Sequence, residues 1–214
     1  MIKIQNELFK ITFENNFFFE FMQFLFDDCK KKNNNILLNI KDAVSLDKYT
    51  NKNTLTYEMG CQFFEDVANQ MSYLEKNGYS VPVFSISDFW ICDGRFIFIQ
   101  EKNIVQIENN SLSITKPFLD KEFFSPEMKQ VKKIPSECPI KSWMFSIALL
   151  ISTLMKLTTT DKFNWKQQVN SNDERFEFIS SEILLLEAIY NTKLYWALER
   201  CFYNDYKKRY FYLI

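Results

Sequence analysis

The chemistry open to this chain is limited first by histidine, which is absent from its 214 residues. Without histidine there is no imidazole base, no Ser-His or Cys-His nucleophile pair and no imidazole metal ligand. The cysteines are odd in number, widely spaced and without a CxxC pair: Cys29, Cys61, Cys92, Cys138 and Cys201. We therefore predict buried, reduced thiols, with a metal or redox role as the alternative.

Glycine-rich phosphate loops are also excluded. The only glycines are Gly60, Gly78 and Gly94, and no two of them lie close together, so neither a P-loop nor a dinucleotide fingerprint can form. The 26 basic and 27 acidic residues leave a net charge of -1 without a long basic run. This balance argues against nucleic acid as a partner. No cofactor is predicted.

The composition is that of a globular protein with a large core. Hydrophobic residues make up 47% of the chain, and 23 residues are Phe. A chain of this length buries roughly two-thirds of its unfolded surface. The first ten residues lack the apolar core of a signal peptide. The most hydrophobic stretch, residues 143–155, is too short to span a bilayer. We expect a soluble, cytoplasmic protein without a membrane span.

Local patterns indicate the elements on which any site must be built. From residue 56 to residue 77 apolar residues recur at helical spacing, with Thr56 as N-cap and Gly78 as C-cap. Asp93-Gly94 between FWIC and RFIFI predicts a type I′ hairpin. The remaining expectations are a strand pair at 103–107 and 111–115, a long ordered loop at 116–141, a buried helix at 142–157, a polar connection at 158–175, and helices at about 181–190 and 192–202.

The first part of the chain is rich in Phe and Asn. Residues 17–29 are apolar on nearly all sides, which fits a buried helix or a strand, and periodicity does not decide between them. ILLNI (36–40) suits a buried strand, and Ser45 is expected to cap a short helix. The order of elements indicates an α+β fold whose second half is dominated by helices.

Five segments, in this order, resemble the C-lobe of eukaryotic-type protein kinases. They are YLEKNG (73–78), the Asp93-Gly94 hairpin, FFSPEM (123–128), WMFSIALLISTLM (143–155) and ERCFYNDYKKR (199–209). The resemblance implies an α+β, protein-kinase-like C-lobe that is mainly helical, with a truncated N-terminal lobe. Residues 1–35 would be a remnant N-terminal segment, and residues 36–214 the C-lobe-like domain. The composition also resembles degenerate kinase-like proteins of large cytoplasmic DNA viruses.

The resemblance implies that the catalytic groups have been replaced. Val83 falls where the family has its catalytic Asp, and a valine cannot accept a proton. The metal-binding Asn falls near Asp88, for which we expect capping of the hairpin entry, with cation binding as the alternative. The metal-binding DFG triplet falls on Gln100-Glu101-Lys102. Trp143 replaces the Asp that normally ties the catalytic loop together. We therefore predict no catalytic, cofactor-binding or metal-binding residue.

One structural feature of the family is matched. Glu127 and Arg209 correspond to the buried ion pair that anchors the activation segment in kinases. A bidentate pair of this kind is strong and directional. The alternative is that both residues are surface charges.

The resulting hypothesis is a catalytically inactive pseudokinase that acts as a scaffold or regulator by binding another protein. Its expected location is the cytoplasm, with the cytoplasm of an infected host cell or the virion as further options. Its oligomeric state is left open. One alternative is a structural virion component. The other is an atypical ATP-dependent phosphotransferase with Asp88, Glu101 and Asp66 as metal ligands.

Overall fold

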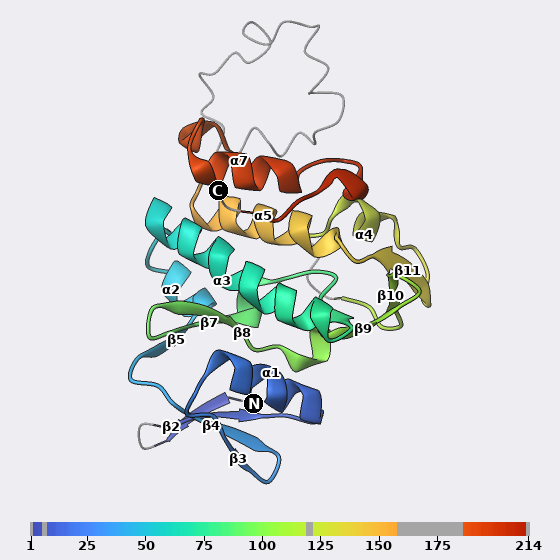
Figure 1. Ribbon diagram of the computed structural model, residues 1–214. Coiled ribbons are helices and arrows are strands. Elements are labelled where there is room, and N and C mark those ends of the chain that lie inside the picture. Colours follow the sequence, from blue (N-terminus) through green and yellow to red (C-terminus); the bar gives the residue numbers. More distant parts are fainter. Residues whose placement is uncertain (1, 6–7, 119–121, 158–185, 213–214) are drawn as a thin grey trace, which may run out of the picture.

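The structure, a computed structural model, describes residues 2–5, 8–118, 122–157 and 186–212 (Figure 1). Its strands form three antiparallel sheets, with orders β1-β2-β4-β3, β11-β10-β9-β6 and β5-β7-β8. The strands are β1 (Ile2–Gln5), β2 (Leu8–Thr12), β3 (Lys30–Lys32), β4 (Asn35–Asn39), β5 (Ala43–Ser45), β6 (Tyr79–Ser80), β7 (Phe89–Cys92), β8 (Arg95–Phe98), β9 (Val105–Glu108), β10 (Ser111–Ile114) and β11 (Ser136–Pro139). The α-helices are α1 (Asn16–Leu25), α2 (Leu46–Thr50), α3 (Tyr57–Lys76), α4 (Pro126–Gln130), α5 (Ser142–Leu154) and α7 (Lys193–Cys201), with 3-10 helices η1 (Ile86–Asp88), η2 (Glu101–Asn103) and η5 (Tyr206–Lys208).

The first sheet and α1 form the N-terminal end of the molecule (Figure 1). In β2 and β4, Phe9 pairs with Leu38, and both side chains are buried. Asn15 caps α1 by accepting a hydrogen bond from the Phe17 N–H at 2.9 Å, and the buried side of the helix carries Phe18 and Phe21. The Phe-rich segment is therefore a helix. The boundary expected at residue 35 falls on the first residue of β4, inside this sheet, because β2 and β4 pair across it.

The predictions for α3 and for the β7–β8 hairpin are confirmed. Thr56 caps α3 by accepting a hydrogen bond from the Met59 N–H at 3.3 Å, and Gly78 follows the helix with a φ of +79°. In the hairpin turn, Asp93 and Gly94 have φ values of +47° and +81°, as a type I′ turn requires. Local sequence signals fix both elements.

The loop predicted at residues 116–141 is wrong in part, because it contains α4 and β11. Ser125 accepts a hydrogen bond from the Met128 N–H at 3.3 Å, and Pro126 occupies the first turn of α4. β11 pairs with β10 in the antiparallel sense. A strand of four residues with a proline in it has little local signal and is stabilised by its partner strand.

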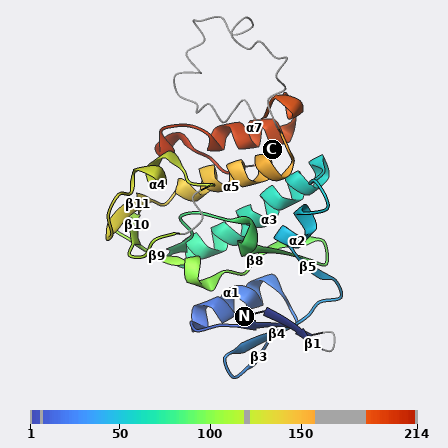
Figure 2. The same cartoon turned by 180° about the vertical axis from the view of Figure 1, so that it is seen from behind.

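Helices α3, α5 and α7 stack in successive layers, and Figure 2 shows the same order from behind. α5 lies between the other two, which explains why nearly every side chain from Ser142 to Leu154 is buried. The predictions for residues 158–175, and for most of a helix at about 181–190, lie outside the described residues. Across the described ranges, no helix has the length and apolar character needed to cross a membrane.

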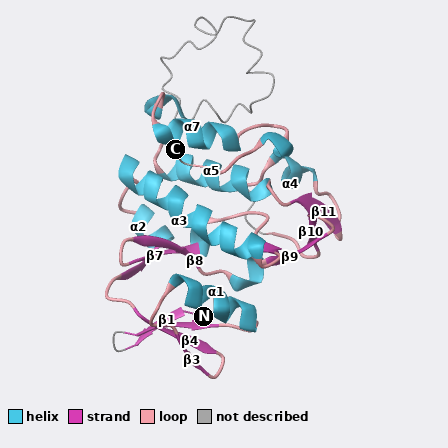
Figure 3. Cartoon of the chain, in the orientation of Figure 1, coloured by secondary structure: helices cyan, strands magenta, loops and turns pink. Residues whose placement is uncertain are grey.

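The expected fold class is corrected by this architecture. The chain is α+β, but it is not mainly helical, since strands in three antiparallel sheets run through the N-terminal end, the middle and one side of the molecule (Figure 3). A kinase-like C-lobe with a truncated N-terminal lobe is likewise not what the structure shows. The prediction failed because strands of two to five residues have weak signals, and most of their pairing is non-local.

Candidate functional site

The residue at the expected position of a catalytic base lies in a hydrophobic cluster. Val83 is 4% exposed and packs in the second core of the molecule, with Leu112, Phe124 and Met128. A buried valine in this environment neither accepts a proton nor orients a hydroxyl group. No base operates at this position.

Asp88 is buried as well, and its carboxylate is held by neighbouring donors. Ser85 donates its backbone N–H to Oδ2 at 2.8 Å, in a capping box around η1, and the Asn103 amide reaches both oxygens at 3.2 and 3.3 Å. Burial raises the pKa of Asp88 to about 6, and these hydrogen bonds only partly offset that effect. The role of this side chain in the structure is therefore to cap a turn.

Glu101 performs a similar task for α1. Its carboxylate accepts the backbone N–H of Glu14 at 2.9 and 3.1 Å and that of Asn15 at 2.5 Å. A negative charge is favourable at the amino end of a helix, where N–H groups lack partners. These hydrogen bonds join the start of α1 to η2, although the two helices are far apart in the sequence.

Asp66 and Gln70 act together on the edge of β8. Asp66 accepts the Phe96 N–H at 2.8 Å, while Gln70 accepts the Phe98 N–H at 2.8 Å and donates to the Phe96 carbonyl at 2.8 Å. Desolvation raises the pKa of Asp66, which is buried in α3. The two side chains take the place of a neighbouring strand.

The three carboxylates considered as metal ligands thus each satisfy a different part of the backbone. Among the residues that the structure describes, no group of three or more Cys, Asp or Glu side chains is arranged to hold a metal ion. The cysteines are free, and burial raises the pKa of Cys138 to about 11 and that of Cys92 to about 12. Neutral thiols of this kind are poor nucleophiles and poor metal ligands.

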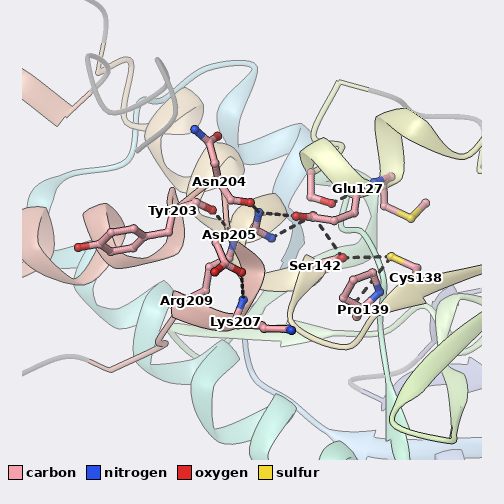
Figure 4. A network of polar contacts seen from close by, with 11 residues as sticks. Glu127, Cys138, Pro139, Ser142, Tyr203, Asn204, Asp205, Lys207 and Arg209 are labelled. Atoms are coloured by element: carbon pink, nitrogen blue, oxygen red, sulfur yellow. Dashed lines mark hydrogen bonds and ion pairs between the residues drawn. The ribbon is translucent and has the colours of Figure 1, made fainter. Parts of the chain in front are cut away.

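Glu127 and Arg209 meet in a network of polar contacts (Figure 4). Arg209 is 0% exposed and donates through both terminal nitrogens, to Glu127 Oε1 at 2.7 Å and to Oε2 at 3.1 Å. It also donates to the backbone carbonyls of Tyr203 at 2.8 Å and Asn204 at 3.4 Å. The guanidinium carbon lies 5.2 Å from the centre of the Phe145 ring. One side chain thereby joins α4, α5 and the C-terminal segment.

A groove of about 720 Å³ opens beside this network, and Cys138, Pro139 and Lys207 belong to both. Its walls come from the end of α3, the β9–β10 turn, β11, the start of α5 and η5. The Lys141 ammonium donates to the Arg209 carbonyl at 2.9 Å and to the Lys207 carbonyl at 3.2 Å. Glu75 accepts the Trp143 indole N–H at 2.8 Å. The groove has both apolar and charged walls, as binding sites have.

Sequence reasoning missed this groove. Trp143 appeared only as the replacement for an acidic residue, yet its indole N–H holds Glu75, a residue 68 positions away. A buried Trp needs an acceptor for its N–H, so the sequence could have predicted a polar partner for Trp143. Nothing local in the sequence identifies which acceptor it finds.

Comparison with known proteins gives no match: no protein-family model matches the chain, and no curated protein does.

Proposed function

We propose that this protein is catalytically inactive, as its sequence resemblance to pseudokinases implies, and that it works by binding another protein. The observation that carries the proposal is the burial of Val83 at the position of the base. Phosphoryl transfer needs a residue that orients the nucleophile and side chains that hold magnesium. Val83 supplies neither.

The engagement of the carboxylates gives further support. Asp88, Glu101 and Asp66 all accept backbone N–H groups, and a metal ion at any of them would compete with these hydrogen bonds. To act as the metal ligands of an atypical phosphotransferase, the three carboxylates would have to give up their hydrogen bonds to three separate parts of the backbone. For this reason we prefer the non-catalytic function.

The Glu127–Arg209 contact supports the proposal that the protein keeps a stable fold without phosphoryl-transfer activity. A protein that acts by shape needs a stable surface, and this pair joins three elements next to the groove. We propose the groove as part of the binding surface. The proposed location is the cytoplasm, which the five free thiols favour because disulfides are rare in reducing compartments.

The experiment is quantitative cross-linking of a tagged chain in its native source, followed by sedimentation of the purified complex. We expect a partner in a defined stoichiometry. A chain that sediments as a monomer and cross-links to no protein above the level of a tag-only control contradicts the proposal.

A further inference from the structure

The charges around the groove are unequally satisfied. The Lys141 ammonium already donates to two carbonyls and lies 5.0 Å from the centre of the Tyr210 ring. Lys207 is exposed at the rim, where water and salt screen its charge. The basic side chains of the groove are therefore either engaged or solvated.

The acidic side chains differ. Within the described residues, the carboxylate of Glu75 has a hydrogen bond to one oxygen, from Trp143. Burial raises the pKa of Glu75, and the Trp143 N–H and the charge of Lys141 offset this only in part, so its negative charge is incompletely compensated. Glu137 in β11 is exposed to water and salt as Lys207 is, and within the described ranges its carboxylate has no hydrogen bond or ion pair. Glu75 and Glu137 both line the groove, so a cation bound there would be attracted by two negative charges.

Among the residues that the structure describes, β11 lies at the edge of its sheet, so some of its backbone groups have no partner strand. Ser111 and Glu108 flank the two-residue β9–β10 turn and pair, so their backbone groups face each other. The backbone groups of successive residues in a strand point to opposite sides, so the N–H and C=O of Leu112 face Cys138 in β11. The N–H and C=O of Glu137 then face away from the sheet, beside the groove.

These backbone groups can pair with an extended segment, and the negative charge of Glu137 indicates the charge that this segment carries. Two copies of this protein pairing symmetrically about Glu137 would place like charges opposite each other, which is destabilising. A segment with a basic side chain makes a favourable pair instead. Pro139, which lacks an N–H, limits the pairing to a short stretch.

We propose that the groove binds an extended segment of another protein, whose Arg or Lys side chain pairs with Glu75 and Glu137 and whose main chain hydrogen bonds to the backbone of Glu137. This mode is an addition of a strand to a sheet edge, with specificity from one charged pocket. The inference rests on the proposed protein-binding function and specifies the chemistry of the partner.

The test uses fluorescein-labelled peptides of alternating threonine and valine with a central arginine, glutamine or glutamate, and fluorescence anisotropy with the full chain. We expect the arginine peptide to bind at least tenfold more tightly than the other two, and N-methylation of its central amides to weaken binding. Glu75→Gln and Glu137→Gln should each weaken it about tenfold, equivalent to about 1.4 kcal/mol. Glu65→Gln, an exposed position on α3 outside the groove, is the matched control and should have no effect.

Glu75→Gln keeps an acceptor for the Trp143 N–H, so this variant is expected to fold, and its melting temperature checks this. Equal affinity for the three peptides, no binding of the arginine peptide, or binding unchanged in both groove variants overturns the inference. A dimer of this chain that Glu137→Gln strengthens, by removing the like charges, or dissociates also overturns it, in favour of a second copy. If a cross-linked partner persists unchanged in both variants, the inference fails while the proposed function stands.

Discussion

Replacing Arg209 with methionine is expected to lower the free energy of unfolding by about 3–5 kcal/mol, the usual cost of removing one partner from a buried ion pair. The structure explains the magnitude. The guanidinium is 0% exposed and the Glu127 side chain is 15% exposed, so the remaining carboxylate would lose its cation where little water can replace it. The carbonyls of Tyr203 and Asn204 would lose their donor as well. For a chain of this size the melting temperature should fall by about 6–20 °C.

The assay is urea unfolding of the wild type, Arg209→Met, Glu127→Gln and the double variant. Because the two side chains share two hydrogen bonds, the effects should be non-additive by at least about 1 kcal/mol in the double-mutant cycle. Arg200→Met is the control, since Arg200 makes one hydrogen bond of 3.4 Å, and we expect a change within about 1 kcal/mol. A loss below about 1 kcal/mol for Arg209→Met, or an additive double variant, would refute the account of this network.

Three further predictions concern side chains with other structural tasks. Burial raises the pKa of Asp88 from 3.8 to about 6, so the folded protein binds this proton more tightly than the unfolded chain does. The resulting stability, about 3 kcal/mol, is full below about pH 4 and is lost as the pH rises through about 6, and this loss should be absent from the urea-unfolding pH profile of Asp88→Asn. Glu101→Gln should weaken the anchor of α1 by about 1 kcal/mol, seen as faster amide hydrogen exchange in α1 alone; unchanged exchange would contradict the capping role. Gly60→Val should destabilise by about 1–3 kcal/mol, because a Cβ there would lie 2.5 Å from the Met155 sulfur; a melting temperature equal to that of the wild type would show that α3 and α5 have room to adjust.

The elements predictable from sequence are those with complete local signals. α3 has a cap, an apolar stripe and a terminal glycine, and the β7–β8 turn has Asp93-Gly94. α4 also has a local signal, because Ser125 and Pro126 are a helix N-cap and first-turn pair, but this signal is short and stands within a stretch with four prolines that otherwise favours a loop. The N-terminal sheet was not predictable, because β2 and β4 are joined by pairing across α1.

The site was less accessible from sequence than the fold. Glu127 and Arg209 are 82 positions apart, and only the resemblance to kinases suggested that they meet. A capping role for Asp88 at the entry to the hairpin was predictable from its position, and its hydrogen bond from the Ser85 N–H agrees with it. The role of Glu101 was not, because it depends on backbone N–H groups 86 and 87 positions away. The groove combines five separate parts of the chain, and its charges become informative only once the partners of Lys141 and Glu75 are known.

The most direct test of the central claim, a protein that binds partners without phosphoryl-transfer chemistry, is a thermal-shift titration with ATP and magnesium. A functional nucleotide site at a hundredfold excess over its dissociation constant adds about 2.7 kcal/mol, or about 5–10 °C in a chain of this size. We predict no shift, because Val83 is buried and the carboxylates Asp88, Glu101 and Asp66 hold backbone groups. A saturable, magnesium-dependent rise of several degrees would contradict the account.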